Sequence, residues 1–132
     1  MTPYFIGLDL GTSSTKVIAF DQRGNTLVTT GVAYPTFYPA VNHAVQKPET
    51  IWEAVQASVR RVLETVDENY TLAGVGMSSA MHTLLPIDAE GNPLTDLMIW
   101  SDNRADTVVE KILSEEGDIF YDVVGVDRKS IV

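Results

Sequence analysis

The residue types best suited to chemistry gather near the N-terminus, where a carboxylate, a glycine, several hydroxyls and an amine occur in quick succession. These residues are Asp9, Gly11, Thr12, Ser13, Ser14 and Lys16. Glycine lets a backbone approach a ligand closely, and hydroxyl and backbone N–H groups donate hydrogen bonds to anions. A carboxylate beside such donors suits a phosphate only if Mg²⁺ or its water shell lies between them. The pattern therefore indicates a cradle for a magnesium-bound phosphate, to which the lysine adds a positive charge.

Two strand-like runs, Tyr4–Leu10 and Thr15–Phe20, must position this group, because they flank it on either side. Both runs are apolar, β-branched and aromatic, and the polar turn between them contains Gly11, as expected for a β-hairpin. Turn residues at Asp21–Asn25 lead into another β-rich run, Thr26–Tyr34. The sequence therefore predicts three consecutive antiparallel strands. Turn chemistry alone leaves open a plain hairpin turn whose hydroxyls only cap the backbone.

A second group of candidate residues follows Leu72–Met77, an apolar run that is predicted to be a short buried strand. An amphipathic helix predicted over Pro48–Val66 precedes it, and the order hairpin, helix, strand favours parallel pairing with the first strand in a mixed sheet. Ser79, Met81 and His82 then stand at the carboxyl end of a strand, where open α/β sheets bind ligands. Their hydroxyl, thioether and imidazole groups suit a polyol or a carboxylate. The same segment is also compatible with a histidine satisfied in the core.

A third group stands at the head of a predicted helix whose buried stripe runs over Ala105–Leu113. Asp102 and Arg104 lie at its start, where a carboxylate and a guanidinium can fix hydroxyl groups and, through paired N–H donors, an acidic end of a ligand. Asp102 can also cap the helix while Arg104 lies on its surface. Trp100 is predicted to be a core residue rather than a wall of the pocket.

The remaining segments are expected to connect or close these elements. Pro35–Lys47 contains two prolines and is predicted to be an extended surface loop. Leu94–Trp100 is a further apolar run, and Gly117 is predicted to end the last helix. Asp118–Val132 is expected to contain one more short helical segment. 

Composition limits the class of protein and its partners. The chain has 132 residues, 45% hydrophobic and 20% charged, which is typical of one soluble globular domain at most. Its net charge of −9 makes nucleic acid and anionic membrane surfaces poor partners. There is no cysteine for a disulfide, a thiolate nucleophile or a cysteine metal site. The N-terminus has no basic leader and no membrane span, so we expect a cytoplasmic protein.

Gly74 and Gly76 match only part of the glycine pattern that is typical of dinucleotide-binding folds.

Taken together, the three groups resemble a known family. Asp9-x-Gly-Thr-Ser-x-x-Lys16 is similar to the first phosphate loop of the sugar kinase, Hsp70 and actin superfamily, and particularly of the FGGY carbohydrate kinases related to glycerol kinase and xylulokinase. The Met81-His82 pair and the Trp100-x-Asp-x-Arg104 pattern match two further family motifs near the sugar pocket, in family order. The form Ser78-Ser-Ala-Met-His82 resembles the gluconate kinase branch more than the xylulokinases.

This resemblance implies an α/β fold of the ribonuclease H-like class, shared by actin, Hsp70 and sugar kinases, with a mixed sheet in the strand order 3-2-1-4-(5) that is incomplete in this chain. Residues 1–132 would form the N-terminal part of the first kinase domain, without the rest of that domain or the second domain. ATP and Mg²⁺ are the implied cofactors. The base aspartate, the second phosphate loop and the adenosine pocket would lie beyond Val132, so we expect the isolated chain to be inactive.

The resemblance also implies a role for each candidate residue. Asp9 would hold the metal through water. The phosphate-binding residues would be Gly11, Thr12, Ser13, Ser14 and Lys16. The sugar-binding residues would be Ser79, Met81, His82, Asp102 and Arg104.

The reaction most favoured by these motifs is transfer of the γ-phosphoryl group of ATP to gluconate. Xylulokinase or another FGGY carbohydrate kinase is the nearest alternative, and an actin- or Hsp70-like ATPase module is the alternative outside the kinases. The expected partner is a small sugar or sugar acid, and a homodimer is left open.

Overall fold

The computed structural model describes residues 1–116, which fall into two compact units. The first unit comprises Met1–Pro35 and Pro48–Ala80. The second comprises Thr36–Lys47 and the described residues from Met81 onwards. No helix within residues 1–116 is long and apolar enough to cross a membrane.

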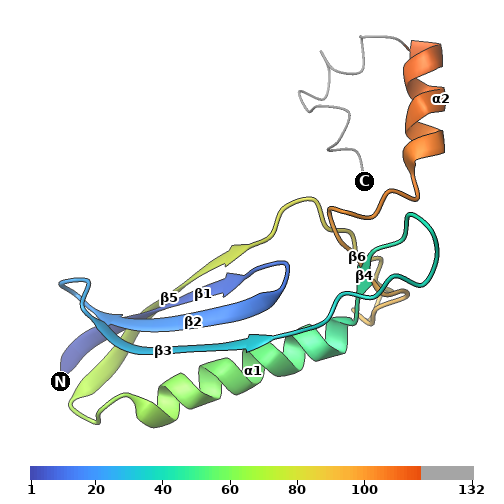
Figure 1. The fold of residues 1–132 in the computed structure, drawn as a ribbon. Helices are drawn as coiled ribbons and strands as arrows, with labels where there is room; N and C mark the ends of the chain where they lie inside the picture. The colour runs from blue at the N-terminus through green and yellow to red at the C-terminus, as the bar shows by residue number, and fades with distance from the viewer. Residues whose placement is uncertain (117–132) are drawn as a thin grey trace. The chain divides into compact units, whose positions relative to one another are not determined.

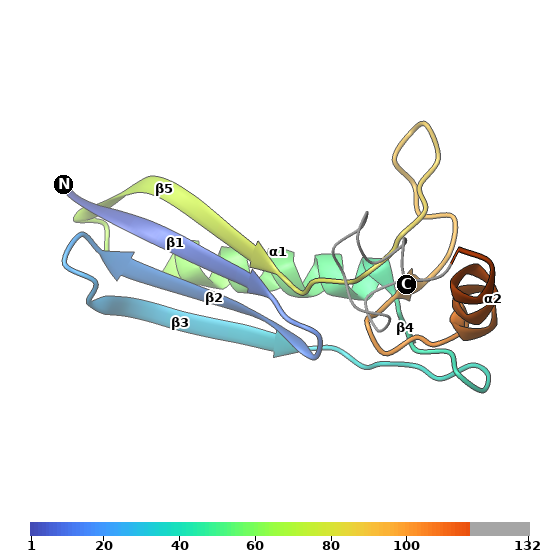
Figure 2. The same ribbon diagram turned by 90° about the horizontal axis from the view of Figure 1, so that it is seen from above.

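The first unit is built on a four-stranded mixed sheet with the order β3-β2-β1-β5 (Figures 1 and 2). Its strands are β1 (Thr2–Leu10), β2 (Ser14–Asp21), β3 (Thr26–Ala33) and β5 (Tyr70–Ser79). The first three pair antiparallel as a meander, and β5 pairs parallel with β1. Since β5 is the fourth long strand in sequence, the predicted order 3-2-1-4 and the predicted mixed sheet are confirmed.

Helix α1 (Pro48–Thr65) covers one face of this sheet (Figure 1). Apolar residues recur along it at helical spacing, and its buried residues include Ala54, Val55 and Val62. Val62 packs in one core cluster with the side chains that alternate inward from β1 and β2, including Ile6 and Val17. Because side chains alternate along a strand, Asp9 and Lys16 fall on the opposite face, which α1 leaves open.

The second unit corrects two predictions about connecting segments. Pro35–Lys47 is not simply a surface loop, because Ala44, Val45 and Gln46 are buried and β4 (Val45–Gln46) pairs antiparallel with β6 (Leu97–Met98). The apolar run that ends at Trp100 forms only this two-residue strand. These short pairings were hard to foresee because their partners lie far apart in sequence and each is too short for a periodic pattern.

Helix α2 (Asp106–Glu116) confirms the helix predicted from Ala105. The predicted end at Gly117 and the predicted segment 118–132 lie outside the described residues.

The buried side chain of Asp102 joins two segments of the second unit by hydrogen bonds. Its side chain is 0% exposed, and its two oxygens accept hydrogen bonds from the Ala44 N–H at 2.8 Å and from the Arg104 backbone N–H, Nε and Nη2 at 3.2, 2.7 and 2.7 Å. Burial by itself would raise the pKa of Asp102, but these hydrogen bonds and the charge of Arg104 outweigh it and lower the pKa to about 2. A carboxylate beyond the reach of solvent thus joins the loop before β4 to the start of α2.

Asp102 should make the stability of the second unit depend on pH. Its folded pKa of about 2 lies below the ordinary 3.8, so its contribution is complete above pH 3.8 and is lost as the pH falls through 2. The shift corresponds to roughly 2 kcal/mol at neutral pH. Asp102→Asn should lower the free energy of unfolding by at least that amount and remove this acid-dependent loss. Urea unfolding at neutral and acid pH, followed by Trp100 fluorescence in a Trp52→Phe background, measures both effects.

The matched control is Asp96→Asn, because Asp96 pairs with Lys47 at 2.8 Å in the same unit but on the surface. A surface pair contributes at most about 1 kcal/mol, so this variant should stay close to the wild type. An Asp102→Asn protein that unfolds at the same urea concentration as the Asp96→Asn protein would contradict the role given to Asp102.

Candidate functional site

The turn that joins β1 to β2 is tight, and Gly11 makes it possible. The Gly11 N–H donates to the Ser14 carbonyl oxygen at 3.0 Å, which leaves Thr12 and Ser13 at the tip. A Cβ atom on Gly11 would lie 3.1 Å from the same Ser14 oxygen, closer than side chains normally pack. The predicted hairpin, with Gly11 in its turn, therefore agrees with the geometry.

The carbonyl oxygens of the turn are held from within the protein. The Thr15 hydroxyl donates to the Asp9 carbonyl oxygen at 3.3 Å, the Tyr34 hydroxyl donates to the Gly11 oxygen, and the Tyr34 N–H donates to the Ser13 oxygen at 3.1 Å. Both donor residues are buried. Sequence reasoning missed Tyr34, which it counted only as the end of a β-rich run. The available signal was that a buried tyrosine hydroxyl needs a partner.

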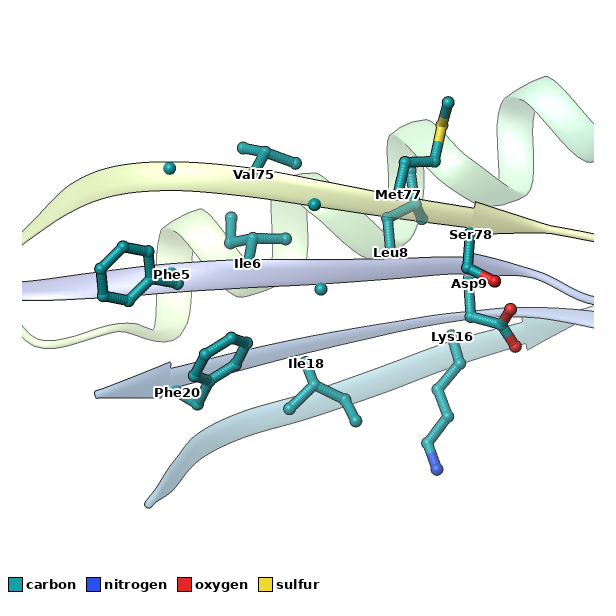
Figure 3. A pocket seen from close by; sticks show the side chains of 13 residues that line it. Phe5, Ile6, Leu8, Asp9, Lys16, Ile18, Phe20, Val75, Met77 and Ser78 are labelled. Atoms are coloured by element: carbon teal, nitrogen blue, oxygen red, sulfur yellow. The ribbon is translucent and has the colours of Figure 1, made fainter. Parts of the chain in front are cut away.

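Asp9, Lys16 and Ser78 lie side by side across three strands. In the sheet, Asp9 pairs with Lys16 on β2 and with Ser78 on β5. Figure 3 shows the three side chains at the same end of the sheet, with the Asp9 carboxylate close to Ser78 and the Lys16 amine turned away from it. Within residues 1–116, neither charged group forms an ion pair or a side-chain hydrogen bond, and both residues are exposed. Among the described residues, the Asp9 carboxylate and the Lys16 amine are therefore available to bind a ligand beside the turn.

A groove of about 820 Å³ follows the open face of the sheet and ends at these polar residues (Figure 3). Its floor is formed by apolar side chains and glycines of β1, β2 and β5, among them Phe5, Ile18, Phe20, Gly74 and Gly76. The rings of Phe5 and Phe20 stack with their centroids 5.9 Å apart. The groove is thus apolar along its length and polar only at the end that carries the turn.

The donor set at this end fits Mg²⁺ held mostly by a phosphate. Within residues 1–116, no three His, Asp or Glu side chains gather into a cluster that could hold a metal by itself. Mg²⁺ is commonly bound through one or two carboxylates, water and substrate phosphates rather than by an all-protein cage. The single exposed carboxylate of Asp9 beside N–H and hydroxyl donors matches that arrangement.

The second predicted group begins where β5 ends. Ser79 is its last residue, exposed and paired with Leu10, and the Ala80 N–H still donates to the Leu10 carbonyl oxygen at 2.8 Å. His82 has a φ of 57°, the left-handed conformation that non-glycine residues adopt infrequently and that often marks functional sites. Met81 and His82 are both exposed, so the alternative of a histidine satisfied in the core is wrong.

In the third predicted group, Asp102 and Arg104 bind each other. The Arg104 Nε and Nη2 groups donate to the two Asp102 oxygens, and this bonding raises the pKa of Arg104. Arg104 remains 35% exposed, and the Nη1 edge of its planar guanidinium is left for a further acceptor. Asp102 itself is fully buried, which does not favour direct contact with a ligand. Trp100 is 56% exposed, so the prediction that it is a core residue is wrong.

The structure thus brings the predicted residues together in two sets. The first unit holds Asp9, Gly11, Thr12, Ser13, Ser14, Lys16 and Ser79 at one end of its sheet. The second unit holds Met81, His82, Asp102 and Arg104, of which the last two are in direct contact.

Known proteins are similar to this chain in both sequence and fold. Gluconokinase of Bacillus subtilis is 36% identical over 115 residues, covering 87% of this chain and 22% of that protein. Xylulose kinase of Staphylococcus xylosus is 34% identical over 114 residues, covering 86% of this chain and 23% of that protein. The crystal structure of gluconate kinase from Lactobacillus acidophilus superposes with a TM-score of 0.81 at 29% identity, over 87% of this chain and 23% of that one.

The solved structure confirms the predicted sugar kinase fold class, and the chain spans less than a quarter of the length of these relatives. Residues 4–126 match the FGGY family of carbohydrate kinases, N-terminal domain. Since that match covers nearly the whole chain, the protein belongs to the FGGY family of carbohydrate kinases.

Proposed function

We propose that residues 1–132 are the N-terminal part of the first domain of a kinase that transfers the γ-phosphoryl group of ATP to a hydroxyl group of gluconate. The observation that carries this proposal is the Asp9 carboxylate, which has no side-chain partner among residues 1–116, beside a hairpin turn whose Gly11 and Ser13 carbonyl oxygens are bonded to Tyr34. The family supports phosphoryl transfer to a carbohydrate, and the similarity to both gluconate and xylulose kinases supports a small polyol as the acceptor.

On the nucleotide side, the chain contributes binding and charge neutralisation. The N–H and hydroxyl groups of Thr12, Ser13 and Ser14 bind the β- and γ-phosphates, and Lys16 adds its positive charge to them. Gly11 closes the turn that presents these groups, because its own N–H donates to Ser14. Asp9 orients the water shell of Mg²⁺, which supplies neutralisation of the phosphate oxygens when it is bound. Phosphoryl transfer depends mainly on such positioning and electrostatic stabilisation. The catalytic base is not among these residues, and we expect it beyond Val132.

On the acceptor side, exposed groups of different chemistry hold the sugar. Ser79 and His82 bind hydroxyl groups, and Met81 provides an apolar wall. Arg104 binds the carboxylate of the sugar acid through its remaining edge. Asp102 acts by holding Arg104 in place, because its own oxygens are occupied and buried.

The choice of gluconate over xylulose depends on Arg104. A guanidinium fork recognises a carboxylate through paired N–H donors, and a ketose such as xylulose offers no such group. Xylulokinase activity remains the runner-up. An actin- or Hsp70-like ATPase module gains no support, because the family to which the chain belongs consists of carbohydrate kinases. A cytoplasmic location and a homodimer stay predictions.

Asp9→Asn should lower kcat of the full-length protein by about a hundredfold or more while the fold survives. The carboxamide has the same shape but lacks the charge that orients the hydrated metal. Coupled ADP release measures kcat, and thermal unfolding confirms the fold. Asp67→Asn is the control, because Asp67 caps the turn before β5 at the far end of the same sheet. Equal kcat values for the Asp9→Asn and Asp67→Asn proteins would refute the role of Asp9.

Gluconate should be phosphorylated with a higher kcat/KM than xylulose or glycerol by the full-length protein. Arg104→Leu should lower kcat/KM for gluconate by about tenfold to a hundredfold, the value of a charged hydrogen bond, and leave kcat/KM for xylulose nearly unchanged. The ratio of the two values is the readout, because a partly unfolded variant lowers both equally. A preference for xylulose in the wild type, or an unchanged ratio in the variant, would contradict gluconate as the substrate.

A further inference from the structure

The tip of the β1–β2 hairpin is hydrogen-bonded to a single residue that directly follows the neighbouring strand. Tyr34 directly follows β3, is 6% exposed, and donates to the turn twice: its hydroxyl bonds the Gly11 oxygen and its N–H bonds the Ser13 oxygen at 3.1 Å. These two carbonyl groups stand on either side of Thr12. One tyrosine therefore fixes two of the peptide planes that form the turn.

The direction of a carbonyl group decides where the next N–H points. In a trans peptide unit the C=O and N–H bonds point in opposite directions. Holding the Gly11 and Ser13 oxygens toward Tyr34 turns the N–H groups of Thr12 and Ser14 to the opposite side. If either peptide plane rotated, a carbonyl oxygen would replace an N–H group on that side, and its partial negative charge would repel a phosphate.

The hydroxyl of Tyr34 stays a donor under ordinary conditions. Burial and, to a smaller degree, the charge of Asp9 raise the pKa of Tyr34, so the phenol keeps its proton at neutral pH. The influence of Asp9 also places the tyrosine in the electrostatic field of the same site.

We propose that Tyr34 is a positioning residue for the nucleotide: it holds the Gly11–Ser14 turn in the orientation that presents N–H groups to the phosphates. This inference rests on the proposed function in that the turn binds ATP. The inference adds a residue to the proposed function, because Tyr34 touches neither the nucleotide nor the sugar and acts only through the backbone of the turn.

The test uses Tyr34→Phe in the full-length protein, because this change keeps the buried ring and removes only the hydroxyl. Loss of one backbone hydrogen bond should raise the Kd for a magnesium complex of a non-hydrolysable ATP analogue by about fivefold to tenfold. KM for ATP should rise by the same factor, while KM for gluconate and kcat at saturating ATP stay unchanged. Amide hydrogen exchange at Gly11 should become faster, because its bond to Ser14 spans the loosened turn.

Tyr38→Phe is the matched control, since it removes the same hydroxyl group from a tyrosine that is 72% exposed and lies outside the turn. It should leave Kd, both KM values and hydrogen exchange as in the wild type. Calorimetry gives Kd, and measuring it well below the melting temperature of each variant keeps the folded fraction near one, so that partial unfolding does not raise the apparent Kd or KM.

The outcomes separate this inference from the proposed function. If the wild type binds the nucleotide and Tyr34→Phe binds it equally well, the positioning role is overturned while the kinase proposal stands. A variant with a lower melting temperature but unchanged nucleotide affinity would show that Tyr34 only stabilises the fold, and would also overturn the role. If the wild type itself binds no nucleotide, the proposed function fails and this inference fails with it.

Discussion

The pairing of β1 with β2 is the constraint on which the rest of the site depends. Its register sets Asp9 opposite Lys16 and closes the turn at Gly11. A shift by one residue would place Asp9 and Lys16 on opposite faces of the sheet, so one of the two charged side chains would lie on the face that α1 covers, where a lone charge is costly to bury. The core residues Ile6 and Val17 oppose such a shift, because one of them would leave the core at the same time. Core packing on one face of the sheet thus fixes the positions of the charged side chains on the other face.

Features that depend on neighbouring residues were predictable from the sequence. The turns at Asp21–Asn25 and Asp88–Asn92 share one design: the aspartate accepts the N–H groups two and four residues on, the asparagine side chain bonds back to it, and the glycine takes a positive φ of 83° or 87°. Helix α1 follows from its apolar spacing and its first-turn proline. The hairpin that carries Asp9 follows from its two apolar strands and its glycine.

Features that depend on distant partners were not predictable in the same way. The Asp102 carboxylate meets the Ala44 N–H across 58 positions, and a capping role for Asp102 accounted for its residue type without requiring that contact. Tyr34 completes a turn 23 positions earlier in the chain, and only the folded meander brings them together. Trp100 is predicted to lie in the core because tryptophan is often buried, but it is 56% exposed. Sequence patterns over neighbouring residues do not predict contacts between residues that lie far apart in the chain.

The most direct test of this account is a crystal structure of the full-length protein with Mg²⁺ and a non-hydrolysable ATP analogue. We predict β- or γ-phosphate oxygens about 3 Å from the N–H and hydroxyl groups of residues 12–14, at hydrogen-bonding distance. We also predict that the Asp9 carboxylate faces the metal across a water molecule. Phosphates bound away from this turn, or a metal ion with no link to Asp9, would contradict it.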